Sequence, residues 1–252
     1  TKIYAGDSER CVLTGTDGNT IYDLEISSDG MRLFVVSRNA GSNTDHDGDK
    51  AYGFDLTSPY DISTCLLASE TELLDNAVFT IGSNAGDYGY TRAGDGSLKN
   101  LKAHRLQGIE LNNDGSKLFL LFMDSLSDSV NGRLYEFNLS TPYDVSTLSI
   151  VTSAGIEIGT ATQTGVTNPA GMRFSANGKK IFLVSHAHNG IQRVLQISLS
   201  KGFDTSSFTI DGSRILGGSG NEMSEANTQT RGVAFSGSGL KIYIGSDRDT
   251  NN

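Results

Sequence analysis

The sequence lacks tryptophan, and it has only two cysteines and three prolines among its 252 residues. No Cys-x-x-Cys or Cys/His spacing is present, so nothing supports a zinc site built on cysteine. No apolar run approaches the roughly 20 residues that a membrane-spanning helix needs, and we expect no membrane insertion. The formal charge is −9 without any basic stripe, so nucleic acid is not an expected partner.

Residues that form turns, by contrast, are abundant. There are 30 glycines, and Ser, Thr, Asn and Asp fill the gaps between short apolar runs. This composition is typical of many short strands joined by turns. The sequence therefore predicts an all-β chain, and it shows no G-x-S-x-G elbow, phosphate loop or HExxH helix.

Four segments of the chain repeat one pattern: an apolar-alternating strand, a tight turn that ends in glycine, a basic residue and a second apolar strand. They are "DLEISSDGMRLFVVSR" from Asp23, "GIELNNDGSKLFLLFM" from Gly108, "GMRFSANGKKIFLVSH" from Gly171 and "GVAFSGSGLKIYIGSD" from Gly232. The turn glycines are Gly30, Gly115, Gly178 and Gly239, and the basic residues are Arg32, Lys117, Lys180 and Lys241. Asp-Gly and Asn-Gly pairs predict two-residue hairpin turns with positive φ angles.

A second phrase recurs between apolar strands. It reads "LTSPYDISTCL" at 56–66, "LSTPYDVSTLSI" at 139–150 and "LSKGFDTSSFTI" at 199–210. Its proline fixes φ at the second position of a turn, and its Asp and Ser side chains can bond to nearby backbone N–H groups. A third strand precedes this turn and a fourth follows it. The unit is therefore a four-stranded antiparallel meander, and tandem meanders indicate a β-propeller of about four blades.

These repeats resemble the broad WD40/YVTN-like propeller superfamily across nearly the whole chain. The "SPYDIST" and "TPYDVST" turns are similar to a repeat found in surface and tail proteins of marine bacteria and their phages. The Trp-Asp and Gly-His signatures of true WD40 blades are missing. The resemblance implies the propeller architecture, and it brings no catalytic residue to this chain.

We interpret residues 1–252 as one propeller domain or as a fragment of a larger one. The units are 1–15 (a fourth strand), 23–74, 108–158, 171–217 and a partial unit 232–252. The partial unit lacks a third strand. Either the chain belongs to a longer polypeptide with more blades, or a strand from a neighbouring subunit fills the gap.

One polar loop carries the residues of a candidate calcium site. In "NTDHDGDK", the residues Asn43, Asp45, Asp47 and Asp49 place oxygen ligands at alternate positions around a glycine, as the start of a calcium loop does. The twelfth position is Phe54 rather than Glu, so further ligands must come from elsewhere. Calcium is the cofactor that we expect, and the alternative is a solvated acidic loop.

Three further candidates are more local. His186 and His188 lie two residues apart, a spacing that points both rings to one side of a strand, so they are either a metal site or solvated loop residues. Cys11 and Cys65 either form one disulfide or remain two buried thiols. Asn138 begins an Asn-Leu-Ser glycosylation acceptor.

Three functions are compatible with these features. The first is a non-catalytic extracellular module on a cell or virion surface, used for adhesion, partner binding or assembly of a surface fibre or virion appendage. Its partners would be a protein, a glycan or a neighbouring subunit that donates a strand. The alternative is a metal-dependent propeller enzyme of the lactonase or hydrolase type. The third, an intracellular WD40-like scaffold, is disfavoured by the missing signatures.

Overall fold

Nearly every regular element of the protein is a β-strand. The computed structural model describes residues 19–39, 49–73, 89–91, 98–100, 104–124, 132–151, 156–158, 169–185, 192–216 and 228–248. Its elements in chain order are β1 (Asn19–Ile26), β2 (Arg32–Asn39), β3 (Lys50–Leu56), η2 (Ile62–Thr64), β4 (Cys65–Glu72), β5 (Gly89–Thr91), β6 (Leu98–Asn100), β7 (His104–Leu111), β8 (Lys117–Asp124), β9 (Gly132–Leu139), η4 (Val145–Thr147), β10 (Leu148–Ile150), β11 (Ile156–Glu157), β12 (Pro169–Phe174), β13 (Lys180–Ser185), β14 (Arg193–Leu199), β15 (Phe208–Ile215), β16 (Thr228–Phe235) and β17 (Ile242–Arg248).

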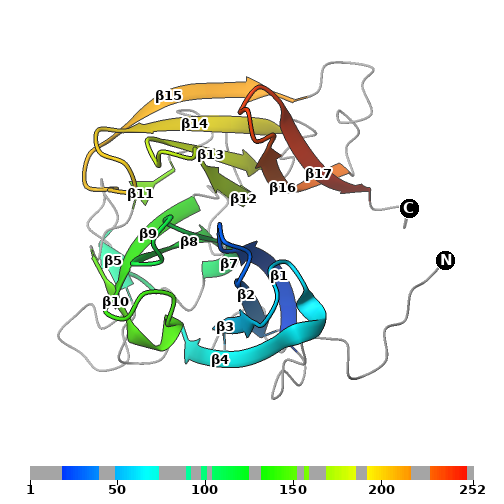
Figure 1. Cartoon of the computed structure of the whole chain (residues 1–252). Helices are drawn as coiled ribbons and strands as arrows, with labels where there is room; N and C mark the ends of the chain where they lie inside the picture. Colours follow the sequence, from blue (N-terminus) through cyan, green and yellow to red (C-terminus); the bar gives the residue numbers. More distant parts are fainter. Residues whose placement is uncertain are drawn as a thin grey trace.

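These strands form antiparallel meanders placed around a common centre (Figure 1). Blade 1 has the order β1-β2-β3-β4, and blade 3 has the order β12-β13-β14-β15. Blade 2 has the order β7-β8-β9-β10, and β11 also pairs with β9. The hairpin β16-β17 begins blade 4, and a small hairpin β5-β6 lies between blades 1 and 2 in the sequence. The predicted fold, an all-β propeller of about four blades, is confirmed, and within the described residues the last blade consists of two strands.

The first strand of each blade lies innermost. Strand β7 packs between β1 and β12, and β12 also packs against β16. Each of the four strands has a register shift at the same place, beside Asp23, Gly108, Gly171 or Gly232. Such a bulge bends a strand. In blade 3 this position requires glycine, because a Cβ on Gly171 would lie 2.8 Å from the carbonyl oxygen of Arg231.

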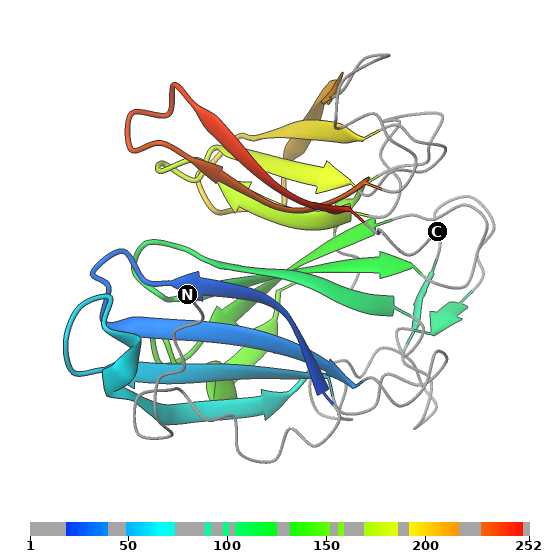
Figure 2. The same cartoon turned by 90° about the vertical axis from the view of Figure 1, so that its right-hand side faces the viewer.

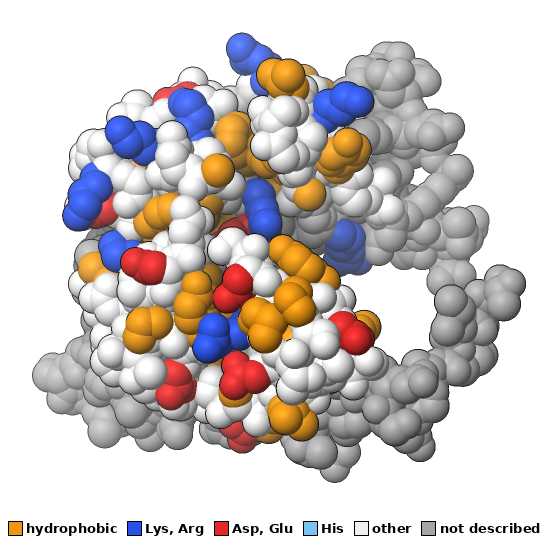
Figure 3. Space-filling model, in the orientation of Figure 1, with side chains coloured by type: hydrophobic (Ala, Val, Ile, Leu, Met, Phe, Trp, Pro, Cys, Tyr) orange, Lys and Arg blue, Asp and Glu red, His pale blue; other side chains and the backbone are white. Residues whose placement is uncertain are grey.

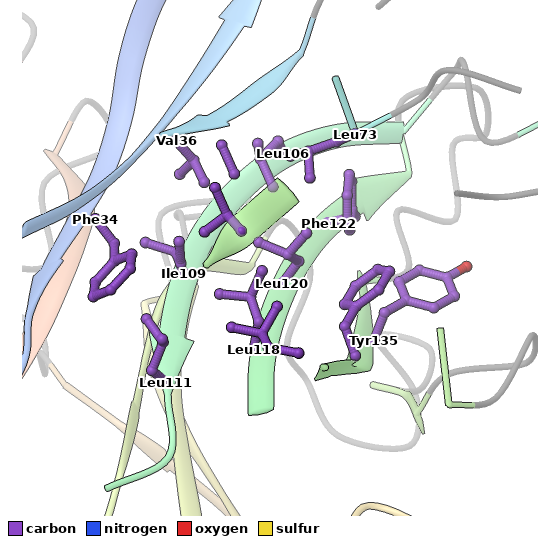
Figure 4. Packing of buried hydrophobic residues seen from close by; sticks show 14 residues of the cluster. Phe34, Val36, Leu73, Leu106, Ile109, Leu111, Leu118, Leu120, Phe122 and Tyr135 are labelled. Carbon is purple, nitrogen blue, oxygen red and sulfur yellow. The ribbon is translucent and has the colours of Figure 1, made fainter. Parts of the chain in front are cut away.

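The hydrophobic core lies between successive blades. Alternation along β2 sends Phe34 and Val36 toward blade 2, where they meet Leu106, Ile109 and Leu118 (Figure 4). A second cluster joins the opposite face of blade 2 to blade 3 in the same way. A third cluster lies on the other face of blade 1 and contains Leu33, Val35, Tyr52 and Phe54. Each fully buried side chain of this size contributes about 1.5–3 kcal/mol, so blade-to-blade packing dominates the stability.

The turns between the first two strands differ from the sequence prediction. In blade 1 the N–H of Gly30 donates to the carbonyl oxygen of Ser27, at 2.8 Å, and closes a four-residue turn. A two-residue Asp-Gly turn of the expected type needs a positive φ at both residues. Gly30 has a φ of 72°, but Asp29 is not among the described residues with positive φ. The expected two-residue turn is therefore wrong. Its physical reason is that the carboxylate of Asp29 accepts the N–H of Met31, a local bond that fixes this turn instead.

The recurrent Pro-Tyr-Asp turn folds back onto the glycine turn of the same blade. The N–H of Tyr143 donates to the carbonyl oxygen of Gly115 at 2.8 Å, and its Oη donates to the carbonyl oxygen of Asn113 at 2.9 Å. Its ring covers Gly115, where an added Cβ would lie 2.4 Å from ring atoms. We call this contact the aromatic clasp. It compensates for the left-handed φ of 66° at Tyr143, a conformation that ordinarily costs about 1 kcal/mol.

Blades 1 and 3 have the same clasp, formed by Tyr60 on Gly30 and by Phe203 on Gly178. Both kinds of turn therefore lie at one end of the molecule, seen at the left in Figure 2. We call this end the turn rim.

Candidate functional site

One position of the repeat places charged side chains at the centre of the propeller. Two residues after the bulge, the first strands carry Glu25, Glu110, Arg173 and Ala234. Because β1, β7 and β12 are neighbours around the centre, the first three of these side chains converge. The convergence brings together two acids and one base from three blades.

The guanidinium of Arg173 pairs with both acids. Its Nη1 lies 2.9 Å from Oε1 of Glu110, and the same nitrogen also binds Oε2 of Glu25. A second contact joins the same two strands just before these acids. A carboxylate oxygen of Asp23 accepts the backbone N–H of Ile109 at 3.0 Å. These four residues, Asp23, Glu25, Glu110 and Arg173, form the central ionic cluster. It connects blades 1, 2 and 3.

Burial changes the acid–base properties of this cluster. Removal from water raises the pKa of Glu110 well above its usual value, and the nearby charge of Glu25 raises it further. Burial also raises the pKa of Glu25, against the opposing effect of Arg173. Burial raises the pKa of Asp23 to about 6, although its hydrogen bond from Ile109 acts in the other direction. The cluster therefore takes up protons near neutral pH more readily than exposed carboxylates do.

A cavity of about 150 Å³ opens above the cluster at the turn rim. Glu25, Glu110 and Arg173 form part of its lining, and the rings of Tyr143 and Phe203 contribute aromatic surface. The remaining lining is mostly hydroxyl and amide groups of the turns, from Ser27, Ser28, Asn112, Asn113 and Ser175. Polar groups beside aromatic rings can hold a ligand rich in hydroxyl groups. This rim cavity is thus a candidate binding site.

A second candidate surface lies on hairpin β16-β17. Leu240 is 88% exposed, Tyr243 56% and Ile242 43%. Among the described residues β17 pairs only with β16, so its outer edge is presented without a neighbouring strand. The hydrophobic side chains over this hairpin are seen at the upper right of Figure 3. Ile242 and Tyr243 follow each other in β17 and point to opposite faces, so exposed apolar side chains lie on both faces of this hairpin, as is typical of interaction surfaces.

Of the four proposed calcium ligands, the described residues include only Asp49. Asp49 is buried directly before β3, and its carbonyl oxygen accepts the N–H of Leu73 at 2.8 Å. Asn43, Asp45 and Asp47 lie outside the described residues, so the calcium site stays a prediction. Within the described ranges no group of three or more His, Cys, Asp or Glu residues could hold a metal ion.

The other candidates have separate outcomes. His186 and His188 lie outside the described residues, so their metal site stays a prediction. Cys65, at the start of β4, is disulfide-bonded, whereas Cys11 lies outside the described residues, so their pairing stays a prediction. Asn138 is exposed near the end of β9, and its glycosylation stays a prediction. No helix in the described part of the chain is long and apolar enough to cross a membrane.

Sequence reasoning did not single out the central ionic cluster. The signal was present, because Glu25, Glu110 and Arg173 occupy one position of the aligned repeats. A charge at a position that the propeller places innermost has to meet its counterparts from the other blades. These three residues can be predicted to meet only if the arrangement of the blades around a common centre is known. The sequence of a single repeat does not specify that arrangement.

Comparisons with known proteins show similarity in architecture alone. The chain matches no protein-family model and no curated protein. Among solved structures it is similar to the nidogen/laminin complex, with 11% identity, a TM-score of 0.42, and coverage of 89% of this chain and 56% of the other. It is also similar to a protein provisionally assigned as a 6-phosphogluconolactonase from Bacteroides fragilis, with 13% identity, a TM-score of 0.47, and coverage of 88% and 63%.

A third similar structure is the β-propeller domain of Cps50 (Swd1) from Myceliophteria thermophila. Here the identity is 13%, the TM-score is 0.40, and the coverage is 92% of this chain and 67% of the other. The chain spans 56% and 63% of the length of the first two proteins named above. At such similarity the fold assignment rests on the sheet topology of the chain itself.

Proposed function

We propose that this chain is a non-catalytic extracellular β-propeller module that binds a partner at a cell or virion surface. It would serve in adhesion or as a building block of a surface fibre or virion appendage. The observation that carries the proposal is the exposed apolar surface of hairpin β16-β17, with Leu240, Ile242 and Tyr243. An exposed strand edge beside apolar side chains favours association with another polypeptide.

Two further features support the proposal. The aromatic clasps hold the turns of blades 1 to 3 against the sheets, which makes the turn rim a firm platform for recognition. The disulfide bond at Cys65 is typical of proteins in oxidising compartments outside the cytosol. A partner protein or a neighbouring subunit would use the hairpin edge, and a glycan would use the hydroxyl- and amide-lined rim cavity.

Binding assays with purified protein test this function. We expect the chain to bind cells, immobilised glycans or a partner subunit, and we expect Tyr243→Glu to weaken protein binding at least tenfold. Leu66→Glu is the matched control, because Leu66 is 64% exposed on blade 1, away from the hairpin. A monomer that binds none of these targets would contradict the proposal.

The alternative is a metal-dependent enzyme of the lactonase or hydrolase type. One observation favours it: the raised pKa values of Asp23 and Glu110 beside the central cavities are typical of acid–base sites. The test is hydrolysis of lactone substrates with Ca²⁺, Mn²⁺ or Zn²⁺ supplied. Turnover that Glu110→Gln abolishes, with folding intact, would favour the enzyme over the binding module.

A further inference from the structure

The boundary between blades 1 and 2 shows how a clasp turn docks on the preceding blade. The guanidinium of Arg32 lies 4.7 Å from the ring centroid of Tyr143, and the ring of Phe34 stacks on the same tyrosine at 6.1 Å. The backbone N–H of Val145, two residues after Tyr143, donates to Oγ of Ser69 at 3.3 Å. The turn of blade 2 is therefore held by a base, an aromatic ring and a polar acceptor of blade 1.

The boundary between blades 2 and 3 repeats this arrangement. Nζ of Lys117 donates to the carbonyl oxygen of Phe203 at 2.7 Å, and the rings of Phe119 and Phe203 lie 6.3 Å apart. The carboxylate of Glu136 accepts both the N–H and the Oγ1–H of Thr205 at 2.8 Å. Arg32 and Lys117 occupy the same repeat position, as do Phe34 and Phe119.

Blade 3 has the same groups on the face that it turns toward blade 4. Lys180 and Phe182 stand at the positions of the base and the aromatic ring. Gln196 is paired with Phe182 across the strands, as Glu136 is paired with Phe119. The ring of Phe235 from β16 already packs on Phe182 at 4.6 Å.

No clasp turn covers this face among the described residues. Val194 and Gln196 are half-buried, whereas their blade 2 counterparts Leu134 and Glu136 are 0% and 2% exposed. Nζ of Lys180 turns instead to Oδ2 of Asp211 in its own blade, at 3.2 Å.

The turn glycine of blade 4 gives independent evidence. Gly239 has a φ of 69°, like Gly30, Gly115 and Gly178. Those three glycines are covered by aromatic rings, but a Cβ on Gly239 would meet no atom within 4 Å. The backbone at Gly239 is thus shaped for a clasp, and the described chain supplies none.

We propose that the outer face of blade 3 and the edge of β17 form a socket for a strand–turn–strand segment of another polypeptide chain that carries the same repeat. The turn of this segment has an aromatic residue between Pro or Gly and Asp. Its ring covers Gly239 and stacks beside Phe182, its carbonyl oxygen accepts from Lys180, and its first strand pairs with β17. The proposal rests on the proposed partner-binding function and specifies the partner's chemistry.

A synthetic peptide tests the socket. The probe is residues 132–151 of this chain, GRLYEFNLSTPYDVSTLSIV, which includes the clasp Tyr143. Calorimetry and NMR with the full 252-residue chain should show saturable binding, with shifts at Phe182 and Gly239. A peptide with Tyr143→Gly should bind at least tenfold more weakly. Equal binding of both peptides would overturn the proposal.

Two chain variants complete the test. Val194→Glu places a charge in the half-buried socket and should abolish peptide binding, while Val151→Glu is the matched control on blade 2, where Val151 is 39% exposed. Circular dichroism verifies that both variants fold. Retained binding in Val194→Glu would overturn the socket. The unmodified chain is also tested for dimers. If it forms dimers and Val194→Glu dissociates them, the polypeptide that fills the socket is a second copy of this chain and not a different protein. If the peptide does not bind while cell or glycan binding persists, the socket fails and the proposed function stands.

Discussion

The carboxylate of Asp23 accepts the backbone N–H of Ile109, and this 3.0 Å bond fastens the first strand of blade 1 to that of blade 2. The other three repeats have glycine where blade 1 has Asp23. Blade 1 therefore has a side-chain contact at the position where Gly171 of blade 3 closely approaches the backbone of Arg231. It also places an acid in a region where burial disfavours its charge.

Asp23 should make stability depend on pH. Its pKa is raised from 3.8 to about 6 in the folded chain, so the folded state binds the proton more tightly than the unfolded state. This contribution is fully present below pH 3.8 and is lost as the pH rises through about 6, with a size of about 3 kcal/mol. Urea unfolding at pH 5 and pH 7.5 should show a smaller difference for Asp23→Asn than for the unmodified chain. Equal differences would refute the assignment.

Arg173 should be essential because it neutralises two acids. Arg173→Met leaves Glu25 and Glu110 near each other without their shared partner, and we expect a loss of about 2–4 kcal/mol in the free energy of unfolding. Adding Glu110→Gln should restore part of the loss, because one unpaired charge is removed. The exposed Arg214→Met serves as control and should change stability by less than about 0.5 kcal/mol. Simple additivity of the two cluster mutations would argue against the pairing.

Two glycines separate the effect of the clasp from that of backbone conformation. Gly115 and Gly239 have nearly the same φ, 70° and 69°, but only Gly115 is covered by a ring. Gly239→Ala should cost about 1 kcal/mol from the left-handed backbone alone. Gly115→Ala should cost at least about 2 kcal/mol more, since its Cβ collides with the ring of Tyr143. Thermal unfolding of both variants measures the difference, and similar melting temperatures would count against the clasp.

The disulfide can be located chemically. We expect proteolysis without reductant to release one linked peptide pair that contains Cys11 and Cys65, the two cysteines of the sequence. Reduction should lower the free energy of unfolding by up to about 4 kcal/mol, because the bond closes a loop of roughly 55 residues. A disulfide between two copies of Cys65 would instead appear as a covalent dimer on a non-reducing gel.

Calcium addition tests the acidic loop. Millimolar Ca²⁺ should raise the melting temperature of the chain, and EDTA should reverse the rise, because a bound ion stabilises the folded state by mass action. Asp45→Asn and Asp47→Asn should remove the effect. Glu70→Gln, an exposed acid on β4, should keep it. A rise that survives both loop substitutions would place the ion elsewhere.

The repeat pattern was enough to predict the blades, because the alternation of apolar residues and the turn glycines act locally. The clasp was not predicted. The pairing of Tyr143 with Gly115 joins two turns that the sequence separates by a whole hairpin, and an aromatic residue at positive φ runs against ordinary preference. The central ionic cluster was missed for a similar reason, because Glu25 and Arg173 come from different blades and only the curvature of the whole array brings them together.

The clasp turns of blades 2 and 3 each touch the glycine of their own blade and the base of the blade before it, as Tyr143 does with Gly115 and Arg32. The boundary between blades 1 and 2 and the boundary between blades 2 and 3 thus use the same matching parts. Recombination that deletes or duplicates one full repeat would join a complementary pair again and yield a foldable gene product. Arrays of different length could arise in this way without any new contact having to evolve.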